Sequence, residues 1–476
     1  MNLRVKLAKL KTDLQEHQQR VVDRLQDDDQ PGLVAVHGLG SGKTLTSIAV
    51  ADALGLPADV VTPAALQENY LKEIKKHTSG KPPKATMHTL ETVARRGGEN
   101  LRNPLLIVDE AHRIRNAGKA RTGLKWSPAE KRLALTGSLL YNHPSDVAGP
   151  INFVAGDNVL PEDPDQFASK FLIDVPRKRS GWDVFRGTPA VYDTRLNPLH
   201  VPTLRDALNK YVDYHPGSSE GFPEREDQVV KVPMARDQMK LYASVIGDMP
   251  PALRRKVLMN LPPNKQEAKD LNAYMSGVRQ VSNTTRGFDQ KLKPQEPKIE
   301  KAVAELQTML DKNPRAKAIV YSNFLESGIK PYQERLEKLK IPYGAFTGDM
   351  PRKTREQMVR DYNNDKLKAL LLSSAGGEGL DLKGTRLIQI LEPHFNEEKL
   401  KQVIGRGIRF KSHAHLPEDE RKVLVQRFLA TRAPEGLAER IGFKQPGYAA
   451  DEYLDELGQR KERLNDQVRR LLQNAA

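Results

Sequence analysis

The chain has 476 residues, more than the ~250–300 at which a single hydrophobic core stops growing, so we expect at least two domains. It has no cysteine, which excludes disulfides and cysteine-ligated zinc, and no apolar run approaches the ~20 residues of a membrane span. Lys and Arg outnumber Asp and Glu by 76 to 61, and the resulting charge of +15 indicates a polyanionic partner such as nucleic acid, with a merely well-solvated surface as the alternative.

Short apolar runs alternate with helix-like stretches in the first part of the chain. We predict helices at 45–54 and through Tyr70 and Ile74, and strands at 33–36, 59–62, 105–108 and 133–136. Strands that alternate with helices indicate right-handed βαβ units and a parallel sheet. Because ligands of such a sheet gather at the carboxyl ends of its strands, we expect the functional site at that edge.

A glycine-rich segment follows the first of these strands, and residues 37–44 read His-Gly-Leu-Gly-Ser-Gly-Lys-Thr. Such a turn can wrap backbone N–H groups around a triphosphate, while its lysine reaches the β- and γ-phosphates and its threonine hydroxyl ligates magnesium. The strict phosphate-loop pattern has glycine where this chain has His37, but the remaining glycines still supply the backbone freedom that a phosphate cradle needs. A strand-to-helix turn without a ligand is the alternative. The predicted nucleotide-binding residues are Gly38, Leu39, Gly40, Ser41, Gly42, Lys43 and Thr44.

An acidic pair follows the strand predicted at 105–108, in the segment Val-Asp-Glu-Ala-His. We predict that Asp109 holds a magnesium ion together with Thr44, and that Glu110 acts on the attacking water. Two such segments in this order, each at the carboxyl end of a strand-like run, predict nucleotide hydrolysis with ATP and Mg²⁺. Lys43, Asp109 and Glu110 are therefore candidate catalytic residues.

The pattern changes along the rest of the chain. Residues 141–230 are rich in Pro, Gly, Asp and Asn, with a strand predicted only at 228–232, and residues 234–285 are predicted to be helical. A second alternating series indicates a second α/β lobe, with strands predicted at 318–321, 343–346, 369–372 and 387–390. Residues 416–476 are charged and helix-prone, as in a C-terminal cap or arm.

The order of these segments resembles that of superfamily 2 helicase-like motors, and among them the Swi/Snf-like ATPases. The similar segments extend from about Leu14 to Leu429 and include 136–138 and 402–409, while the continuation at 412–423 looks more like viral or phage members. The resemblance implies an α/β fold with two tandem RecA-like parallel-sheet lobes. The predicted domains are an N-terminal RecA-like ATP-binding lobe at 1–222, a helical inter-lobe region and linker at 223–297, a C-terminal RecA-like helicase lobe at 298–415 and a helical C-terminal extension at 416–476.

The resemblance also implies further site residues. Gln18 would recognise adenine, with an ordinary surface glutamine as the alternative, and Gly379 and Asp381 would belong to the nucleotide site. Arg406 and Arg409 are three residues apart, so on one helical face both can reach a γ-phosphate and stabilise transition-state charge; a solvated helix face is the alternative. The predicted nucleic-acid contacts are Thr62, Pro63, Thr89, Ser322, Asn323, Ser373 and Ser374. The alternative for Thr62, Ser322, Ser373 and Ser374 is that they cap helices.

These features together predict a nucleic-acid-dependent ATPase motor, in which DNA stimulates ATP hydrolysis and hydrolysis drives translocation on duplex DNA. One alternative is a helicase that separates DNA strands in the 3′-to-5′ direction. Another is an ATP-gated, transcription-associated recruitment factor, in which 416–476 docks a polymerase or another replication or transcription protein. We expect no membrane partner, and a location in the cytoplasm of a bacterial or virus-infected cell.

Overall fold

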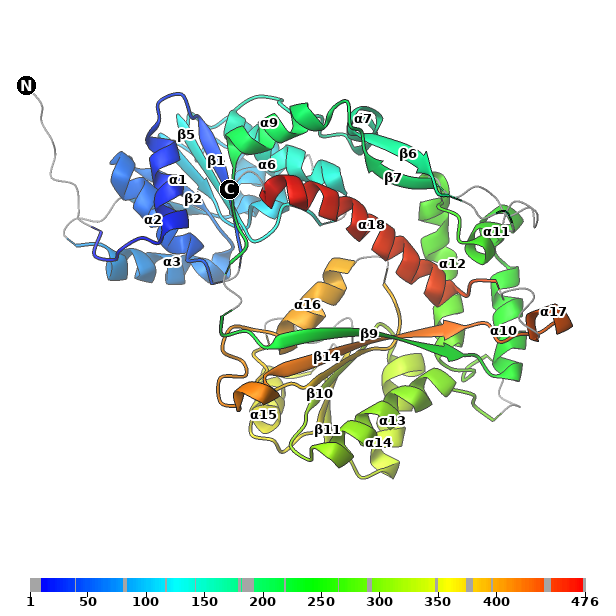
Figure 1. Cartoon of the computed structure of the whole chain (residues 1–476). Helices are drawn as coiled ribbons and strands as arrows, with labels where there is room; N and C mark the ends of the chain where they lie inside the picture. The colour runs from blue at the N-terminus through cyan, green and yellow to red at the C-terminus, as the bar shows by residue number, and fades with distance from the viewer. Residues whose placement is uncertain are drawn as a thin grey trace, which may run out of the picture. The chain divides into compact units, whose positions relative to one another are not determined.

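The computed structural model describes residues 10–473, apart from 39, 80–83, 116–117, 142, 179–180, 182–191, 218–219, 264, 289–292, 347–349, 374–379, 395–396 and 441–446. The chain forms two compact units (Figure 1). The first is built from the described residues of Met1–Val184, Tyr192–Ser218 and Arg460–Ala476, and the second from those of Ser219–Gln459. None of the described helices is long and apolar enough to cross a membrane.

The first unit contains a parallel sheet of six strands in the order β3-β2-β4-β5-β1-β8. The strands predicted from apolar runs in this part of the chain are all present, and β3 and β8 are additional. Every residue of β1 and β4 is buried, as expected for parallel strands with helices on both faces. The strands are β1 (Gly32–His37), β2 (Ala58–Val61), β3 (Ala85–His88), β4 (Leu105–Val108), β5 (Lys131–Thr136) and β8 (Val212–His215).

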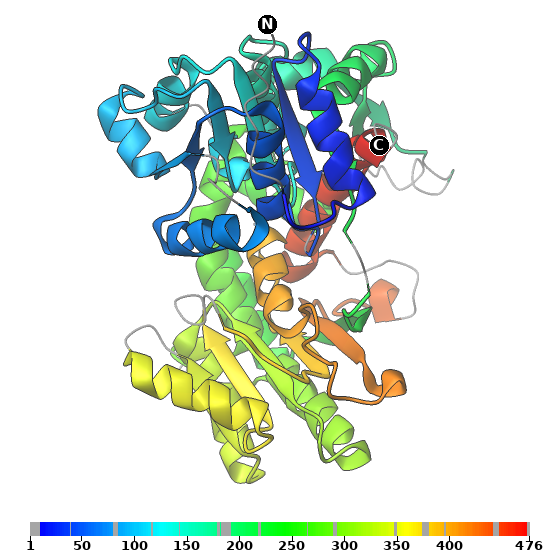
Figure 2. The ribbon, with the colours of Figure 1, turned by 90° about the vertical axis from the view of Figure 1, so that its left-hand side faces the viewer.

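Helices cover both faces of this sheet (Figure 2). Leu33 and Ala35 of β1 pack on one face against α1 (Glu16–Gln26), α2 (Lys43–Leu54) and α3 (Ala64–His77). Val34 and Val36 pack on the other face, whose core includes residues from helices later in the chain. Those helices are α4 (Leu90–Arg96), α5 (Lys119–Lys125), α6 (Ala148–Ala155), α7 (Pro164–Phe171), α9 (Val201–Tyr211) and the last turns of α18 (Ala450–Gln473). The smaller elements are η1 (Ala111–Ile114), η2 (Pro144–Val147) and the antiparallel strands β6 (Leu172–Pro176) and β7 (Tyr192–Leu196).

The second unit contains another parallel sheet of six strands, in the order β11-β12-β10-β13-β14-β9. One face packs against α13 (Pro297–Lys312) and α14 (Lys330–Lys338), and the other against α15 (Arg352–Asn363) and α16 (Glu397–Gly407). The two sheets confirm the predicted α/β class with two tandem parallel-sheet lobes. The strands are β9 (Glu224–Pro233), β10 (Ala318–Ser322), β11 (Tyr343–Phe346), β12 (Ala369–Ser373), β13 (Leu387–Ile390) and β14 (Lys422–Thr431), and the short turns are η3 (Leu325–Ile329), η4 (Glu418–Glu420) and α17 (Leu437–Arg440).

A separate helical core lies within the second unit. It is formed by α10 (Arg236–Gly247), α11 (Pro251–Met259) and α12 (Lys265–Asn283), together with the first turns of α18. Tyr242 of α10, Met275 of α12 and Tyr453 of α18 are all fully buried in it. These helices occupy the stretch at 234–285 that the sequence predicts to be helical.

Residues 416–476 are only partly helical, which corrects the prediction of a wholly helical extension. Residues 422–431 form β14, which pairs with β13 on one side and along its whole length with β9 on the other. Val423, Val425 and Phe428 of this strand are buried in the cores of the sheet. The charged residues around and within the segment mask this apolar pattern when composition alone is considered.

Candidate active site

The glycine-rich segment forms a tight loop between the end of β1 and the start of α2. Gly40 and Gly42 have φ angles of +75° and +72°, a left-handed conformation that residues with side chains rarely adopt. A Cβ atom at Gly38 would lie 2.2 Å from the carbonyl oxygen of Pro216, whereas one at Gly40 would meet nothing within 4 Å. The loop is therefore closely packed at its start and open at Gly40, as a phosphate cradle requires.

Lys43 is the first residue of α2, directly after this loop, and its side chain is hydrogen-bonded back to the start of the loop. Its Nζ donates hydrogen bonds to the carbonyl oxygens of His37 (3.0 Å) and Gly38 (3.3 Å). Burial lowers the pKa of Lys43, and the negative charges of Glu110 and Asp109 act against this effect. The predicted catalytic lysine and acidic pair are thus close enough to interact electrostatically in the first unit.

Asp109 and Glu110 follow β4 directly but differ in environment. The carboxylate of Asp109 accepts hydrogen bonds from the Thr62 hydroxyl (3.2 Å) and from the backbone N–H of Glu110 (2.9 Å). Burial and the charge of Glu110 raise the pKa of Asp109. By contrast, contact with His112, whose Nδ1 lies 3.2 Å from Oε2 of Glu110, lowers the pKa of Glu110 against the effect of burial. Neighbouring carboxylates with oppositely shifted pKa values suit different roles, and an ionised Glu110 suits the orientation of water.

The backbone of Glu110 is strained. Its φ angle is +53°, in the left-handed region that residues with side chains seldom occupy. His112, which contacts the Glu110 carboxylate, packs in turn against Tyr141, with ring centroids 4.7 Å apart. Backbone strain of this kind costs roughly 1–3 kcal/mol and concentrates at active sites, so this conformation supports a functional role for Glu110.

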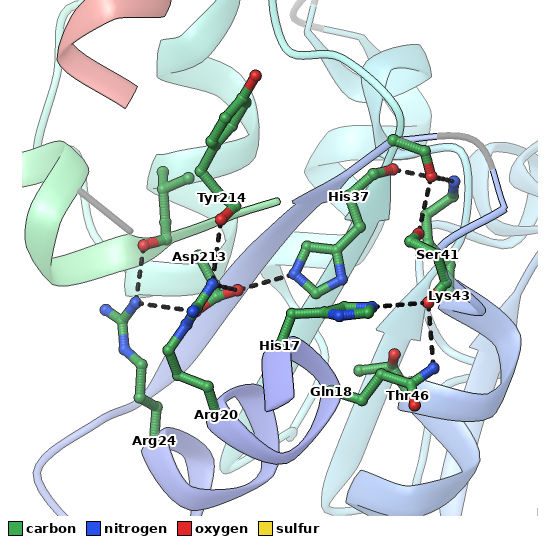
Figure 3. Close-up of polar contacts among 12 residues, drawn as sticks. His17, Gln18, Arg20, Arg24, His37, Ser41, Lys43, Thr46, Asp213 and Tyr214 are labelled. Atoms are coloured by element: carbon green, nitrogen blue, oxygen red, sulfur yellow. Dashed lines mark hydrogen bonds and ion pairs between the residues drawn. The ribbon is translucent and has the colours of Figure 1, made fainter. Parts of the chain in front are cut away.

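Gln18 of α1 is hydrogen-bonded to the glycine-rich loop, which is called the phosphate loop below after its predicted role (residues 37–44; Figure 3). Its Nε2 donates to the carbonyl oxygens of Ser41 (3.0 Å) and Gly42 (3.4 Å), and its Oε1 accepts from the backbone N–H of Gln15 (2.9 Å). The alternative of an ordinary surface glutamine is wrong, because the Gln18 side chain is buried. Recognition of adenine by Gln18 stays a prediction.

The hydroxyl groups predicted to contact nucleic acid in the first unit have partners within the protein. Thr62 donates to Asp109, as described above. Thr89 caps α4 by accepting a hydrogen bond from the backbone N–H of Thr92 (3.1 Å), and Pro63 stands at the start of α3. Contacts of these three residues with nucleic acid stay predictions.

In the second unit, the predicted contact residues Ser322 and Ser373 are buried, and both are hydrogen-bonded within the protein. The Ser322 hydroxyl donates to Glu392 (2.9 Å), and the neighbouring backbone N–H of Asn323 donates to the same carboxylate. The Ser373 hydroxyl donates to the carbonyl oxygen of Phe346 (3.2 Å). A nucleic acid that contacts either hydroxyl must therefore displace a protein partner, and these contacts also stay predictions.

The two candidate arginines do not share a helical face, which corrects the prediction from their spacing. Helix α16 ends at Gly407, so Arg406 lies in its last turn and Arg409 lies beyond it. Nε of Arg409 donates back to the carbonyl oxygen of Gly405 (3.1 Å), while Arg406 is buried. Asp381 is exposed, and its backbone oxygen accepts a hydrogen bond from Asn363. The predicted residues Leu39, Ser374 and Gly379 lie outside the described residues.

We expect the free energy of unfolding to fall as the pH drops from about 7 to about 5.5. Burial lowers the pKa of His37, His143, His215 and His413 from the ordinary value of 6.5. Below pH 6.5 the histidines of the unfolded chain therefore bind protons, whereas these buried histidines of the folded chain stay neutral until the pH is lower. Their contribution to the free energy of unfolding is fully present above pH 6.5 and decreases as the pH falls below that value. Urea denaturation at a series of pH values measures the effect, and a constant or rising free energy of unfolding toward acid would contradict it.

Comparison with known families identifies the chain. Residues 85–287 match the SNF2-related domain, and residues 298–411 match the helicase conserved C-terminal domain, so that about two thirds of the chain is matched. The chain belongs to the SNF2-related, helicase-like proteins. The predictions of this family and of an ATP-hydrolysing enzyme are therefore confirmed. The acidic pair lies inside the SNF2-related match, whereas the phosphate loop at 37–44 precedes it.

Two viral proteins align with nearly the whole SNF2-related chain. "Putative ATP-dependent RNA helicase L538" of Acanthamoeba polyphaga mimivirus is 28% identical over 472 residues and covers 97% of both chains. "Termination factor NPH-I homolog" of African swine fever virus is 24% identical over 561 residues, which cover 95% of this chain and 76% of the relative. Both relatives come from viruses, which agrees with the predicted resemblance to viral members. The solved "Sulfolobus solfataricus SWI2/SNF2 ATPase core in complex with dsDNA" covers 93% of each chain at 16% identity and a TM-score of 0.36.

Proposed function

We propose that this SNF2-related chain is a DNA-stimulated ATPase that uses hydrolysis to move along duplex DNA. The observation that carries the ATPase site is the position of Lys43, which is hydrogen-bonded to the start of the phosphate loop and lies close enough to Asp109 and Glu110 to interact with their charges. A nucleic acid as the stimulating partner is supported by the helicase-like family and by the net charge of +15. Duplex DNA is proposed from the resemblance to Swi/Snf-like motors.

The residues at the loop fit ATP with a bound magnesium ion. Thr44 in the first turn of α2 and the partly buried carboxylate of Asp109 offer the hard oxygen ligands that Mg²⁺ prefers. When bound, the ion would neutralise charge on the phosphates. In the proposed site Lys43 binds the β- and γ-phosphates, and Glu110 orients the attacking water.

RNA is the second candidate substrate, because the mimivirus relative that aligns over 97% of this chain is named an ATP-dependent RNA helicase. ATPase rates with duplex DNA, single-stranded DNA, duplex RNA, single-stranded RNA and no nucleic acid separate the candidates. We expect the strongest stimulation by duplex DNA, with affinity falling steeply as salt rises, because bound phosphates release counterions. Stimulation by RNA alone would overturn the choice of DNA, and no stimulation by any nucleic acid would overturn the motor.

Movement along DNA is tested with a triplex substrate. A translocase removes the third strand in the presence of ATP and leaves the duplex intact, whereas a helicase also separates the strands of a duplex. We expect triplex displacement without strand separation, and Lys43→Ala gives the background of each assay. Strand separation at a comparable rate would favour the helicase alternative.

The recruitment alternative places a docking arm at 416–476. Deletion of this segment would not test docking cleanly, because Phe428 of β14 and Tyr453 and Val468 of α18 are fully buried in the cores. Docking is better tested at exposed positions such as Leu437, whose side chain is 77% exposed. Under the proposed function, Leu437→Asp leaves DNA-stimulated ATP hydrolysis unchanged.

A further inference from the structure

A cluster of polar side chains lies against the phosphate loop in the first unit (Figure 3). It consists of His17 and Arg20 of α1, His37 at the end of β1, and Asp213 and His215 of β8. The side chains of His37 and Asp213 are completely buried. Because burying polar groups costs free energy unless they are hydrogen-bonded, their contacts indicate what the cluster holds in place.

Asp213 is the centre of this cluster. Its carboxylate accepts hydrogen bonds from Nε2 of His37 (2.8 Å) and from Nε and Nη2 of Arg20 (2.5 and 3.0 Å). Burial opposes ionisation of Asp213, but the hydrogen bonds from His37 and Arg20 outweigh it, so that the pKa of Asp213 lies below its ordinary value. Burial also lowers the pKa of His37, so near neutral pH an uncharged imidazole donates to a carboxylate.

His37 stands where the strict phosphate-loop pattern has glycine. A glycine at this position has no side chain and cannot reach Asp213. The next residue, Gly38, is joined to the same strand through its backbone, because its N–H donates to the carbonyl oxygen of His215 (2.9 Å). Two successive residues at the start of the loop are thus hydrogen-bonded to β8, His37 through its side chain and Gly38 through its backbone.

The middle of the loop is fastened to α1. Nε2 of His17 donates to the carbonyl oxygen of Ser41 (2.9 Å), which also accepts from Gln18. The ring of His17 stacks on that of His215, with centroids 3.8 Å apart and an interplanar angle of 1°. A trans peptide directs its C=O and N–H to opposite sides, so a Ser41 carbonyl held toward α1 directs the N–H of Gly42 away from α1.

We propose that His37 and Asp213 are positioning residues of the ATP site, which fix the start of the phosphate loop so that its N–H groups are arranged for the phosphates before ATP binds. The inference rests on the proposed ATP site. A loop that is already ordered loses less conformational freedom on binding, so loosening it weakens affinity. Since both residues act through the loop, the effect should fall on KM for ATP more than on kcat.

Asp213→Asn and His37→Gly test the proposal. The first removes the charge that holds His37 and Arg20, and the second restores the strict pattern but removes the imidazole. We expect each variant to raise KM for ATP and Kd for ADP about tenfold, the loss typical of one charge-assisted hydrogen bond, with kcat within about twofold of wild type. His37→Gln, whose side-chain amide can donate to Asp213, should restore KM to near the wild-type value.

Asp59→Asn is the matched control. Asp59 of β2 lies in the same sheet, is buried, and accepts a hydrogen bond from Nε2 of His88 (2.9 Å), as Asp213 does from His37. Its other partners, Arg102 and Asn103, lie outside the phosphate loop. We expect Asp59→Asn to lower the melting temperature and to leave KM for ATP unchanged.

The outcomes separate a positioning role from a structural one. If Asp213→Asn lowers the melting temperature as Asp59→Asn does but leaves KM and Kd at wild-type values, Asp213 is only structural and the inference is wrong. A wild-type KM in His37→Gly would contradict it equally, and the two His37 variants decide the matter if Asp213→Asn does not fold. Normal hydrolysis in Lys43→Ala would instead overturn the proposed ATP site itself.

Discussion

Lys43→Ala is expected to abolish ATP hydrolysis, with turnover at least ~10³-fold below wild type. Lys43 is the cation of the phosphate loop, where it donates to the carbonyl oxygens of His37 and Gly38 and interacts electrostatically with both carboxylates of the acidic pair. In the proposed site its ammonium group contacts the β- and γ-phosphates, and alanine leaves their charge without this partner. Phosphate release at saturating duplex DNA measures the loss, while DNA binding, followed by fluorescence anisotropy, should stay intact.

Lys131→Ala is the matched control for this variant. Lys131 begins β5 in the same sheet, and its Nζ donates to the carbonyl oxygens of Asp27 (2.6 Å) and Gln30 (2.8 Å). The Lys131→Ala substitution therefore also removes a lysine that binds two backbone carbonyls. This lysine lies at the amino end of a strand, away from the edge of the sheet that carries the phosphate loop. We expect hydrolysis to persist in Lys131→Ala. Near-normal turnover in Lys43→Ala would remove the assigned ATP site.

The parts of the site that consist of consecutive residues could be predicted from the sequence. The apolar runs at 33–36 and 105–108 appear as β1 and β4, and each leads directly into a segment with chemical function. The glycine spacing before Lys43 likewise needs no distant partner, because the loop is built from one short stretch of chain. Local patterns of this kind are visible because each residue's conformation depends mainly on its neighbours.

The polar cluster against the loop could not be predicted, because its members are far apart in the sequence. Asp213 lies 176 residues from His37, and β8, which carries it, is a strand of only four residues with a charged side chain inside it. The contact depends on the pairing of β8 with β1, which places His37 opposite His215. The one local signal was the histidine at a position where the pattern expects glycine.

The predicted nucleic-acid contacts show a second limit of sequence patterns. The sequence shows that a hydroxyl group stands at a strand end, but its hydrogen-bond partner depends on which segment lies beside it in the fold. Thr62 meets Asp109, 47 residues later, and Ser322 meets Glu392, 70 residues later. In both places a carboxylate from elsewhere in the chain, partly buried in Asp109 and fully buried in Glu392, accepts a hydrogen bond from the hydroxyl that the prediction assigned to a ligand.

Arg406→Ala is expected to reduce kcat by ~10³-fold or more while ATP affinity changes little. An arginine that donates to the transferring phosphoryl group acts on charge that develops in the transition state, so its loss affects turnover rather than binding. Single-turnover hydrolysis measures the rate, and titration with a fluorescent ATP analogue measures affinity. Equal losses of rate and affinity in Arg406→Ala would argue against this role.

Arg409→Ala is the informative comparison, because the structure distinguishes the two arginines. Arg406 lies in the last turn of α16, whereas Arg409 follows the end of the helix and donates to the carbonyl oxygen of Gly405 (3.1 Å). Because α16 holds the backbone of Arg406 while Arg409 lies beyond the end of the helix, we expect Arg409 to matter less to turnover than Arg406. A loss in Arg409→Ala as large as that in Arg406→Ala, both at unchanged affinity, would restore the sequence prediction that both arginines act on the transition state.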